Sequence, residues 1–136
     1  GRKIIPLLNT YCSERSDRVL AIKSLGQLRY LSAVKFADVV IGNSSSGLIE
    51  VPSFDVPSVN IGLRQKGRLA AKSVLNCGVD DTDIFAAIEL AVSRRYKREN
   101  ETIINPYGQG DASSKIIQMI KDLDFKPMKV FHNIGV

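Results

Sequence analysis

The chain has 136 residues, of which 44% are apolar and 24% are charged, a composition typical of one globular domain with a core rather than of a disordered chain. No apolar stretch approaches the roughly 18 residues of a membrane-spanning helix, and the N-terminal residues lack the layout of a secretory signal peptide. The net charge of +5 comes from scattered basic residues without the interleaved aromatic residues of a nucleic-acid site. A small anion such as a nucleotide diphosphate explains this surplus as well, and solvated helix faces account for most of the basic residues in either case.

Short strands and helices alternate in the first part of the chain. The spacing of apolar residues predicts a helix from Ile4 to about Tyr11, and the apolar run Val19–Ile22 predicts a short strand. A second helix is expected over Gln27–Ala37. It leads into a strand at Val39–Ile41, whose continuous apolar character is typical of burial on both faces.

The same alternation continues in the second part. We expect a short helix from about Gly47 to Pro52 and strands at Ser58–Ile61 and Ser73–Cys77. The acidic cluster Asp80–Asp83 suits the N-terminus of the amphipathic helix that follows it, and a last helix begins near Asp111. This order predicts an α/β fold, a Rossmann-like parallel sheet with helices on both faces.

We expect residues 1–123 to form one domain and residues 124–136 to form a C-terminal tail. The chain opens on a helix, whereas parallel α/β domains usually begin with a strand. Its start therefore suggests a truncation, with further chain upstream of residue 1.

Hydroxyl residues follow the strand at Val39–Ile41, in the run Gly42-Asn43-Ser44-Ser45-Ser46-Gly47. A glycine turn between a parallel strand and a helix, with N–H groups and small side chains, is typical of a phosphate site. Plain helix capping by one of the serines explains the same pattern. The run alone therefore leaves a ligand site and a simple cap about equally open.

Three further positions bear on this choice. Glu50 would repel a diphosphate but suits a ribose diol, although an acid supporting the helix start is the better explanation of this position taken alone. Arg64 lies in a basic loop between Gly62 and Gly67 at what should be the same sheet edge, where its guanidinium suits phosphate oxygens. The earlier loop around Ser24 and Leu25 is a weak candidate for contacts with a flat base.

Other chemistry is not indicated. The one histidine, His132, has no neighbours at metal-ligand spacing, and nothing around the serines resembles a nucleophile elbow. Cys12 and Cys77 are far apart in the sequence, so we expect two small buried thiols in a reducing cytoplasm. We expect no metal, no cofactor, no nucleic acid and no membrane partner.

Three blocks of sequence resemble one family. They are Gly42–Glu50, Pro57–Arg68 and Asn105–Ser113, and their order and spacing are similar to those of the UDP-N-acetylglucosamine 2-epimerase family, most closely its hydrolysing, sialic-acid-pathway branch. The resemblance implies the C-terminal half of a two-domain GT-B fold, with the nucleotide sugar bound between the domains. It also implies a cytoplasmic enzyme that is commonly a homo-oligomer.

The resemblance assigns roles to the candidate residues. Ser44 and Ser45 would hold the diphosphate of UDP, Glu50 the ribose, and Arg64 would belong to the same nucleotide site. The base would lie near Ser24 and Leu25, where the alignment is looser. The implied reaction eliminates UDP to give a 2-acetamidoglucal, to which water adds, so that UDP-N-acetylglucosamine yields N-acetylmannosamine and UDP.

The chain lacks the family's catalytic carboxylates and histidine, which lie in the N-terminal domain and upstream of residue 1. We therefore expect no catalytic residue here, and a chain that alone binds UDP weakly and does not turn over substrate. Two alternatives are a domain of another GT-B enzyme, either a non-hydrolysing 2-epimerase or a glycosyltransferase, and a non-catalytic nucleotide-binding module. The sequence upstream of residue 1 would separate them, because the enzymes need a second Rossmann-like domain there.

Overall fold

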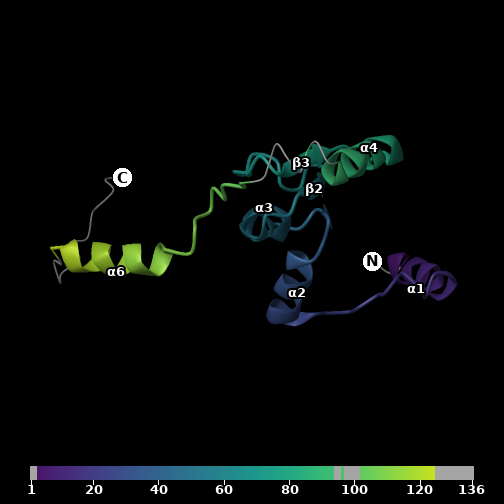
Figure 1. The fold of residues 1–136 in the computed structure, drawn as a ribbon, viewed down its shortest axis with the longest axis horizontal. Helices are drawn as coiled ribbons and strands as arrows, with labels where there is room; N and C mark the ends of the chain where they lie inside the picture. The colour runs from purple at the N-terminus through teal and green to yellow at the C-terminus, as the bar shows by residue number, and fades with distance from the viewer. Residues whose placement is uncertain (1–2, 94–95, 97–101, 125–136) are drawn as a thin grey trace, which may run out of the picture.

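A computed structural model describes residues 3–93, 96 and 102–124 of the chain. Its elements are helices and short strands in mixed order (Figure 1). In chain order they are α1 (Ile4–Glu14), α2 (Gly26–Lys35), β1 (Val40–Gly42), α3 (Ser46–Ile49), the 3-10 helix η1 (Val51–Phe54), β2 (Ser58–Ile61), β3 (Val74–Cys77), α4 (Asp81–Val92) and α6 (Ala112–Asp122). The predicted tail lies almost wholly outside the described residues.

The three strands form one parallel sheet in the order β1-β2-β3. Ser58 of β2 is in register with Val40 of β1 and with Val74 of β3, so these three side chains share a face. The crossover from β1 to β2 runs through α3 and η1, and α4 contacts both β2 and β3. The predicted α/β, Rossmann-like parallel sheet is confirmed.

The core lies on the face of the sheet that carries Val40 and Val74. One cluster joins α2 to η1 and the chain before β2, with Val34, Val51 and Val56 at its centre and Val40 packed against them. A second cluster, formed by Leu48, Ala71 and Val74, fixes α3 over β3. Leu48 and Val51 are both almost completely buried, so the short α3–η1 segment is held by packing rather than by its own length.

Two predictions about strands were wrong. Val19–Ile22 forms no strand, and Leu20 remains 80% exposed. An apolar run becomes a strand only where a neighbouring strand pairs with its backbone, and among the described residues nothing pairs with this one. For the same reason β1 is an edge strand, and Ile41 is 47% exposed rather than buried on both faces.

The predicted helix boundaries were close, but burial differs from one helix to another. Acidic residues occupy the first turn of α4, as expected. Neither α1 nor α6 has a buried residue, although both carry apolar stripes, and both lie away from the sheet in Figure 1. Among the helices that the structure describes, none is long and apolar enough to cross a membrane.

Candidate functional site

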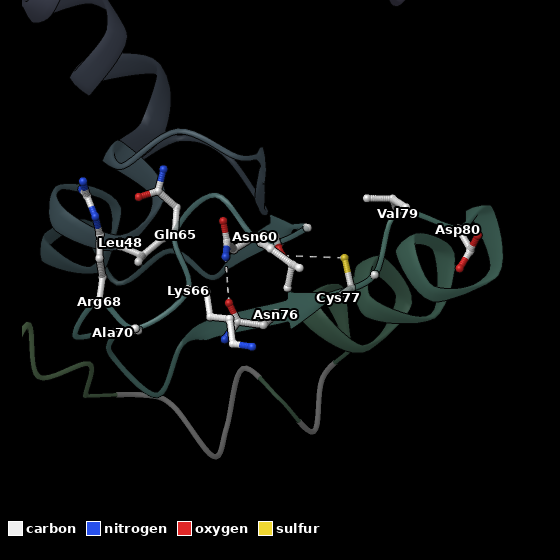
Figure 2. A pocket seen from close by; sticks show the side chains of 14 residues that line it. Leu48, Asn60, Gln65, Lys66, Arg68, Ala70, Asn76, Cys77, Val79 and Asp80 are labelled. Atoms are coloured by element: carbon white, nitrogen blue, oxygen red, sulfur yellow. Dashed lines mark hydrogen bonds between the residues drawn. The ribbon is translucent and has the colours of Figure 1, made fainter.

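The carboxyl ends of the three parallel strands lead into two hollows that share Leu48 and Asn60. The larger, here called the groove, has a volume of about 910 Å³ and lies over the ends of β2 and β3 (Figure 2). The smaller, about 30 Å³, lies beside the end of β1 and includes Ser44. Ligands of open α/β sheets bind at this edge.

Asn43–Ser45, here called the serine loop, connects β1 to α3. The Ser44 hydroxyl accepts a hydrogen bond from the Ser46 N–H at 3.3 Å, and the Ser44 carbonyl accepts one from the Gly47 N–H at 3.2 Å. Ser44 therefore supports the start of the helix, as the capping alternative predicted. The N–H groups of Ser44 and Ser45 stay outside the helical bonds and are available to an anion.

Contacts from two neighbouring elements hold the start of α3, directly after the serine loop. The Tyr30 hydroxyl of α2 lies 2.7 Å from the Ser46 hydroxyl. The buried Ser58 hydroxyl of β2 donates to the Gly47 carbonyl at 2.7 Å. The hydroxyls of Ser44 and Ser46 therefore take part in bonds within the protein. The Ser45 hydroxyl has no hydrogen-bond partner in the described part of the chain.

Gly62–Arg68, here called the basic loop, leaves the end of β2 and borders the groove. Its centre is anchored by Gln65, which is only 5% exposed and donates from Nε2 to the Asn43 carbonyl at 2.8 Å. Figure 2 shows Gln65 beside Leu48. The hydroxyl-rich and basic loops therefore do lie together, as the sequence predicted.

Polar side chains also line the groove between β2 and β3. Asn60 is 4% exposed and donates from Nδ2 to Asn76 Oδ1 at 2.8 Å, and the Cys77 thiol donates to the Asn60 carbonyl at 3.8 Å (Figure 2). The Asn60 Oδ1 and Gln65 Oε1 atoms have no hydrogen-bond partner. Burial raises the pKa of the Cys77 thiol, and the nearby Asp83 carboxylate raises it further. Cys77 and Cys12 are both half-buried rather than fully buried as predicted.

Glu50 sits at the junction of α3 and η1, half-buried. The described residues offer its carboxylate no ion pair or hydrogen bond. A side chain from far along the chain fixes the backbone next to it: Asn105 Nδ2 donates to the Ile49 carbonyl at 2.8 Å and to the Ser53 hydroxyl at 2.7 Å. The turn-rich loop after residue 104 thus braces the Glu50 junction.

The remaining predicted site residues lie at separate points. Arg64 is exposed in the basic loop, and like Glu50 it lines neither hollow. Ser24 is exposed before α2, where its hydroxyl accepts from the Gly26 N–H at 3.4 Å, and Leu25 is half-buried as the N-cap residue. The structure brings the serine and basic loops together, but it brings neither Ser24 nor Leu25 to the same hollow.

Sequence reasoning missed the residues that organise this edge. Tyr30, Asn60, Gln65 and Asn105 make the bonds described above, and none was singled out. One signal was available, because Asn60 is a polar residue inside an apolar strand and such a residue needs a buried partner. His132 lies outside the described residues. Within those residues no group of three or more metal-ligating side chains occurs.

Comparisons with known proteins agree on one family. The family model described as UDP-N-acetylglucosamine 2-epimerase matches residues 1–121. A GDP/UDP-N,N'-diacetylbacillosamine 2-epimerase (hydrolyzing) of Campylobacter jejuni is 39% identical over 87% of this chain and 30% of its own length. The polysialic acid biosynthesis protein P7 of Escherichia coli is 38% identical over 82% of this chain and 28% of its own. A UDP-N-acetylglucosamine 2-epimerase of Neisseria meningitidis is 34% identical over 64% of this chain and 23% of its own length. The chain thus spans less than a third of the length of these relatives.

Proposed function

The chain belongs to the UDP-N-acetylglucosamine 2-epimerase family, and from this premise we propose that it is the UDP-binding domain of a hydrolysing member. The whole enzyme would convert UDP-N-acetylglucosamine and water to N-acetylmannosamine and UDP, in the biosynthesis of sialic-acid-type sugars. The names of the Campylobacter and Escherichia relatives support the hydrolysing branch and the pathway. A cytoplasmic location and a homo-oligomeric state belong to the same proposal.

The observation that carries the proposal is the hydrogen bond between Gln65 and the Asn43 carbonyl, 2.8 Å long. It holds a loop with exposed N–H groups and a serine hydroxyl beside a loop that carries Arg64. Backbone N–H groups and a guanidinium are complementary to phosphate oxygens. An anion at this edge would therefore be contacted from both loops at once.

Each candidate residue then has a task in holding UDP. Ser44 and Ser45 bind the diphosphate through their N–H groups and the free Ser45 hydroxyl, and Arg64 adds a positive charge. Glu50 accepts from the two ribose hydroxyls, which explains a half-buried carboxylate that has no ion pair or hydrogen bond among the described residues. Ser24 and Leu25 would meet the base from the loop before α2.

The tasks suit a domain that stabilises a leaving group. In the proposed elimination the bond from C1 of the sugar to the diphosphate oxygen breaks, and negative charge builds up on UDP. Donors already fixed around the phosphates stabilise that charge as it develops. The proton transfers at C2 and the addition of water would fall to residues of the other domain.

A second sugar substrate has a specific observation in its favour. The most identical of the relatives above is named for a diacetamido sugar rather than for N-acetylglucosamine. The two sugars would share the UDP contacts of this domain. They would differ at the hexose, for which this chain supplies no assigned residue.

Incubation of the full-length protein with each UDP-sugar tests the proposal, with UDP release measured and the sugar product identified by NMR. We expect UDP and a free 2-epimerised sugar from one of the two. A UDP-linked epimer without UDP release would instead identify a non-hydrolysing enzyme. Binding of UDP without any change in either sugar would favour a non-catalytic nucleotide-binding module.

A further inference from the structure

One buried side chain connects the serine loop to the basic loop. Gln65 lies between the exposed residues Arg64 and Lys66, yet it is itself 5% exposed. Its Nε2 atom reaches the carbonyl of Asn43, which is 22 residues earlier in the chain. Among the side-chain hydrogen bonds of the described residues, this is the bond that joins these two loops.

The basic loop is also tied to the end of β3, where the Gly62 N–H donates to the Cys77 carbonyl at 2.9 Å. Gly62 and Gly67, near its two ends, have φ angles of +74° and +83°, a backbone conformation that glycine adopts without strain. Between them the backbone bonds are local, from the Lys66 N–H to the Leu63 carbonyl and from the Arg68 N–H to the Gln65 carbonyl. Such turns set the shape of the loop but not its distance from β1.

We propose that Gln65 is a positioning residue, which sets the place of Arg64 relative to the N–H groups of Ser44 and Ser45. This inference rests on the proposed function, because it takes Arg64 and the serine loop as the two sides of the diphosphate site. Gln65 is buried and follows Arg64 directly in the chain. Its burial therefore holds the Arg64 guanidinium on the exposed side of the loop. An anion then meets donors already in place and does not have to order the loop itself.

The two ends of the Gln65 amide allow positioning to be separated from stability. Nε2 makes the bond to Asn43, whereas the buried Oε1 has no partner. In Gln65→Met the side chain keeps its length but loses both the Nε2 donor and the Oε1 acceptor. Removal of an unpaired buried acceptor is favourable and offsets the lost bond, so we expect this variant to fold.

The test is a double-mutant cycle in the full-length protein, with the Kd for UDP measured by calorimetry. Gln65→Met should weaken UDP binding about tenfold, roughly the effect of one lost hydrogen bond. In an Arg64→Ala background the same change should have no further effect, because Gln65 acts through Arg64. Gln118→Met, a matched change on the exposed surface of α6, should leave the Kd unchanged.

Gln65→Glu gives a second readout, which reports on the bond to the Asn43 carbonyl. The carboxylate cannot donate to the Asn43 carbonyl, but the protonated carboxyl group can. The ratio of the variant's Kd to that of the wild type should therefore fall toward one as the pH is lowered. This comparison at each pH also cancels the titration of UDP itself.

The outcomes distinguish the inference from the function on which it rests. If Arg64→Ala weakens binding and the effect of Gln65→Met simply adds to it, or is absent, the positioning role is overturned and the UDP site stands. A Kd ratio for Gln65→Glu that does not change with pH counts against the positioning role in the same way. If Arg64→Ala leaves the Kd unchanged, the assignment of Arg64 to the UDP site fails, and the inference fails with it.

Discussion

Glu50 is the residue on which the ribose assignment depends. In the full-length protein, Glu50→Ala should raise the Kd and the KM for UDP ligands strongly. The ribose hydroxyls would lose a charged acceptor, a loss of roughly 1.5–3 kcal/mol. Ser45→Ala should have a milder effect, because the backbone N–H groups still serve the phosphate. Calorimetric titration with UDP measures both.

Glu89→Ala is a suitable control for the Glu50 variant, since Glu89 is an exposed carboxylate on α4, outside both loops. It should bind UDP as the wild type does. A normally folded Glu50→Ala protein with an unchanged Kd would remove Glu50 from the site.

Cys77 offers a second test at a single residue. Burial and the charge of Asp83 both raise the pKa of its thiol, so little thiolate forms near neutral pH. Asp83→Asn removes the charge and should lower this pKa, with faster alkylation of Cys77 by iodoacetamide at pH 8. Peptide-level mass spectrometry gives the rate, with Cys12 as the internal reference. An equal or slower rate at Cys77 in the variant would show that Asp83 does not control the thiol.

Local patterns pointed to the serines, Arg64 and Glu50, because glycine turns, hydroxyl residues and charges are visible in a short stretch of sequence. The same reasoning missed Gln65 and Asn105. Their bonds span 22 and 56 residues, and only the fold brings such partners together. A buried amide is recognisable as such only once its surroundings are known.

At the level of elements, the conformation of the basic loop requires glycine, and replacing it should lower the stability of the protein. Gly67 has a φ of +83°, and no atom lies within 4 Å of the position of an added Cβ. The only cost of Gly67→Ala is therefore the strain of a left-handed backbone conformation at alanine. We expect a loss of roughly 1–2 kcal/mol in the free energy of unfolding, measured by urea denaturation of the full-length protein.

Gly47→Ala is the matched control for Gly67→Ala. Gly47 lies in α3 without a positive φ, and an added Cβ would meet Ser58 atoms at 3.7 Å, an ordinary contact. Alanine in a helix is favourable, so this variant should be as stable as the wild type or more so. Equal destabilisation of both variants would argue against the left-handed conformation of Gly67.

The elements also differ in how far the sequence could predict them. Helix spacing is a local property, and α1, α2, α4 and α6 were expected close to their observed bounds. A strand depends on a partner, and the run Val19–Ile22 shows the consequence, since its apolar residues stay unpaired and Leu20 is exposed. Burial likewise depends on neighbours, which explains why the apolar stripe of α6 covers nothing in the described structure.

At the scale of the whole molecule, the chain covers less than a third of its relatives' length, and under the proposed function its site residues bind UDP rather than react. We predict that this chain by itself releases no UDP from UDP-N-acetylglucosamine, whereas the full-length protein does. A coupled assay for UDP measures both. Release by the isolated chain above background would mean that it contains catalytic groups not identified here.

The most direct test of the UDP site is a crystal structure of the full-length protein with UDP bound. The diphosphate should lie against the N–H groups of Ser44 and Ser45 with Arg64 on its other side, and the ribose hydroxyls should donate to Glu50. UDP bound elsewhere, or bound at this edge with Glu50 and Arg64 both out of hydrogen-bonding reach, would contradict the account.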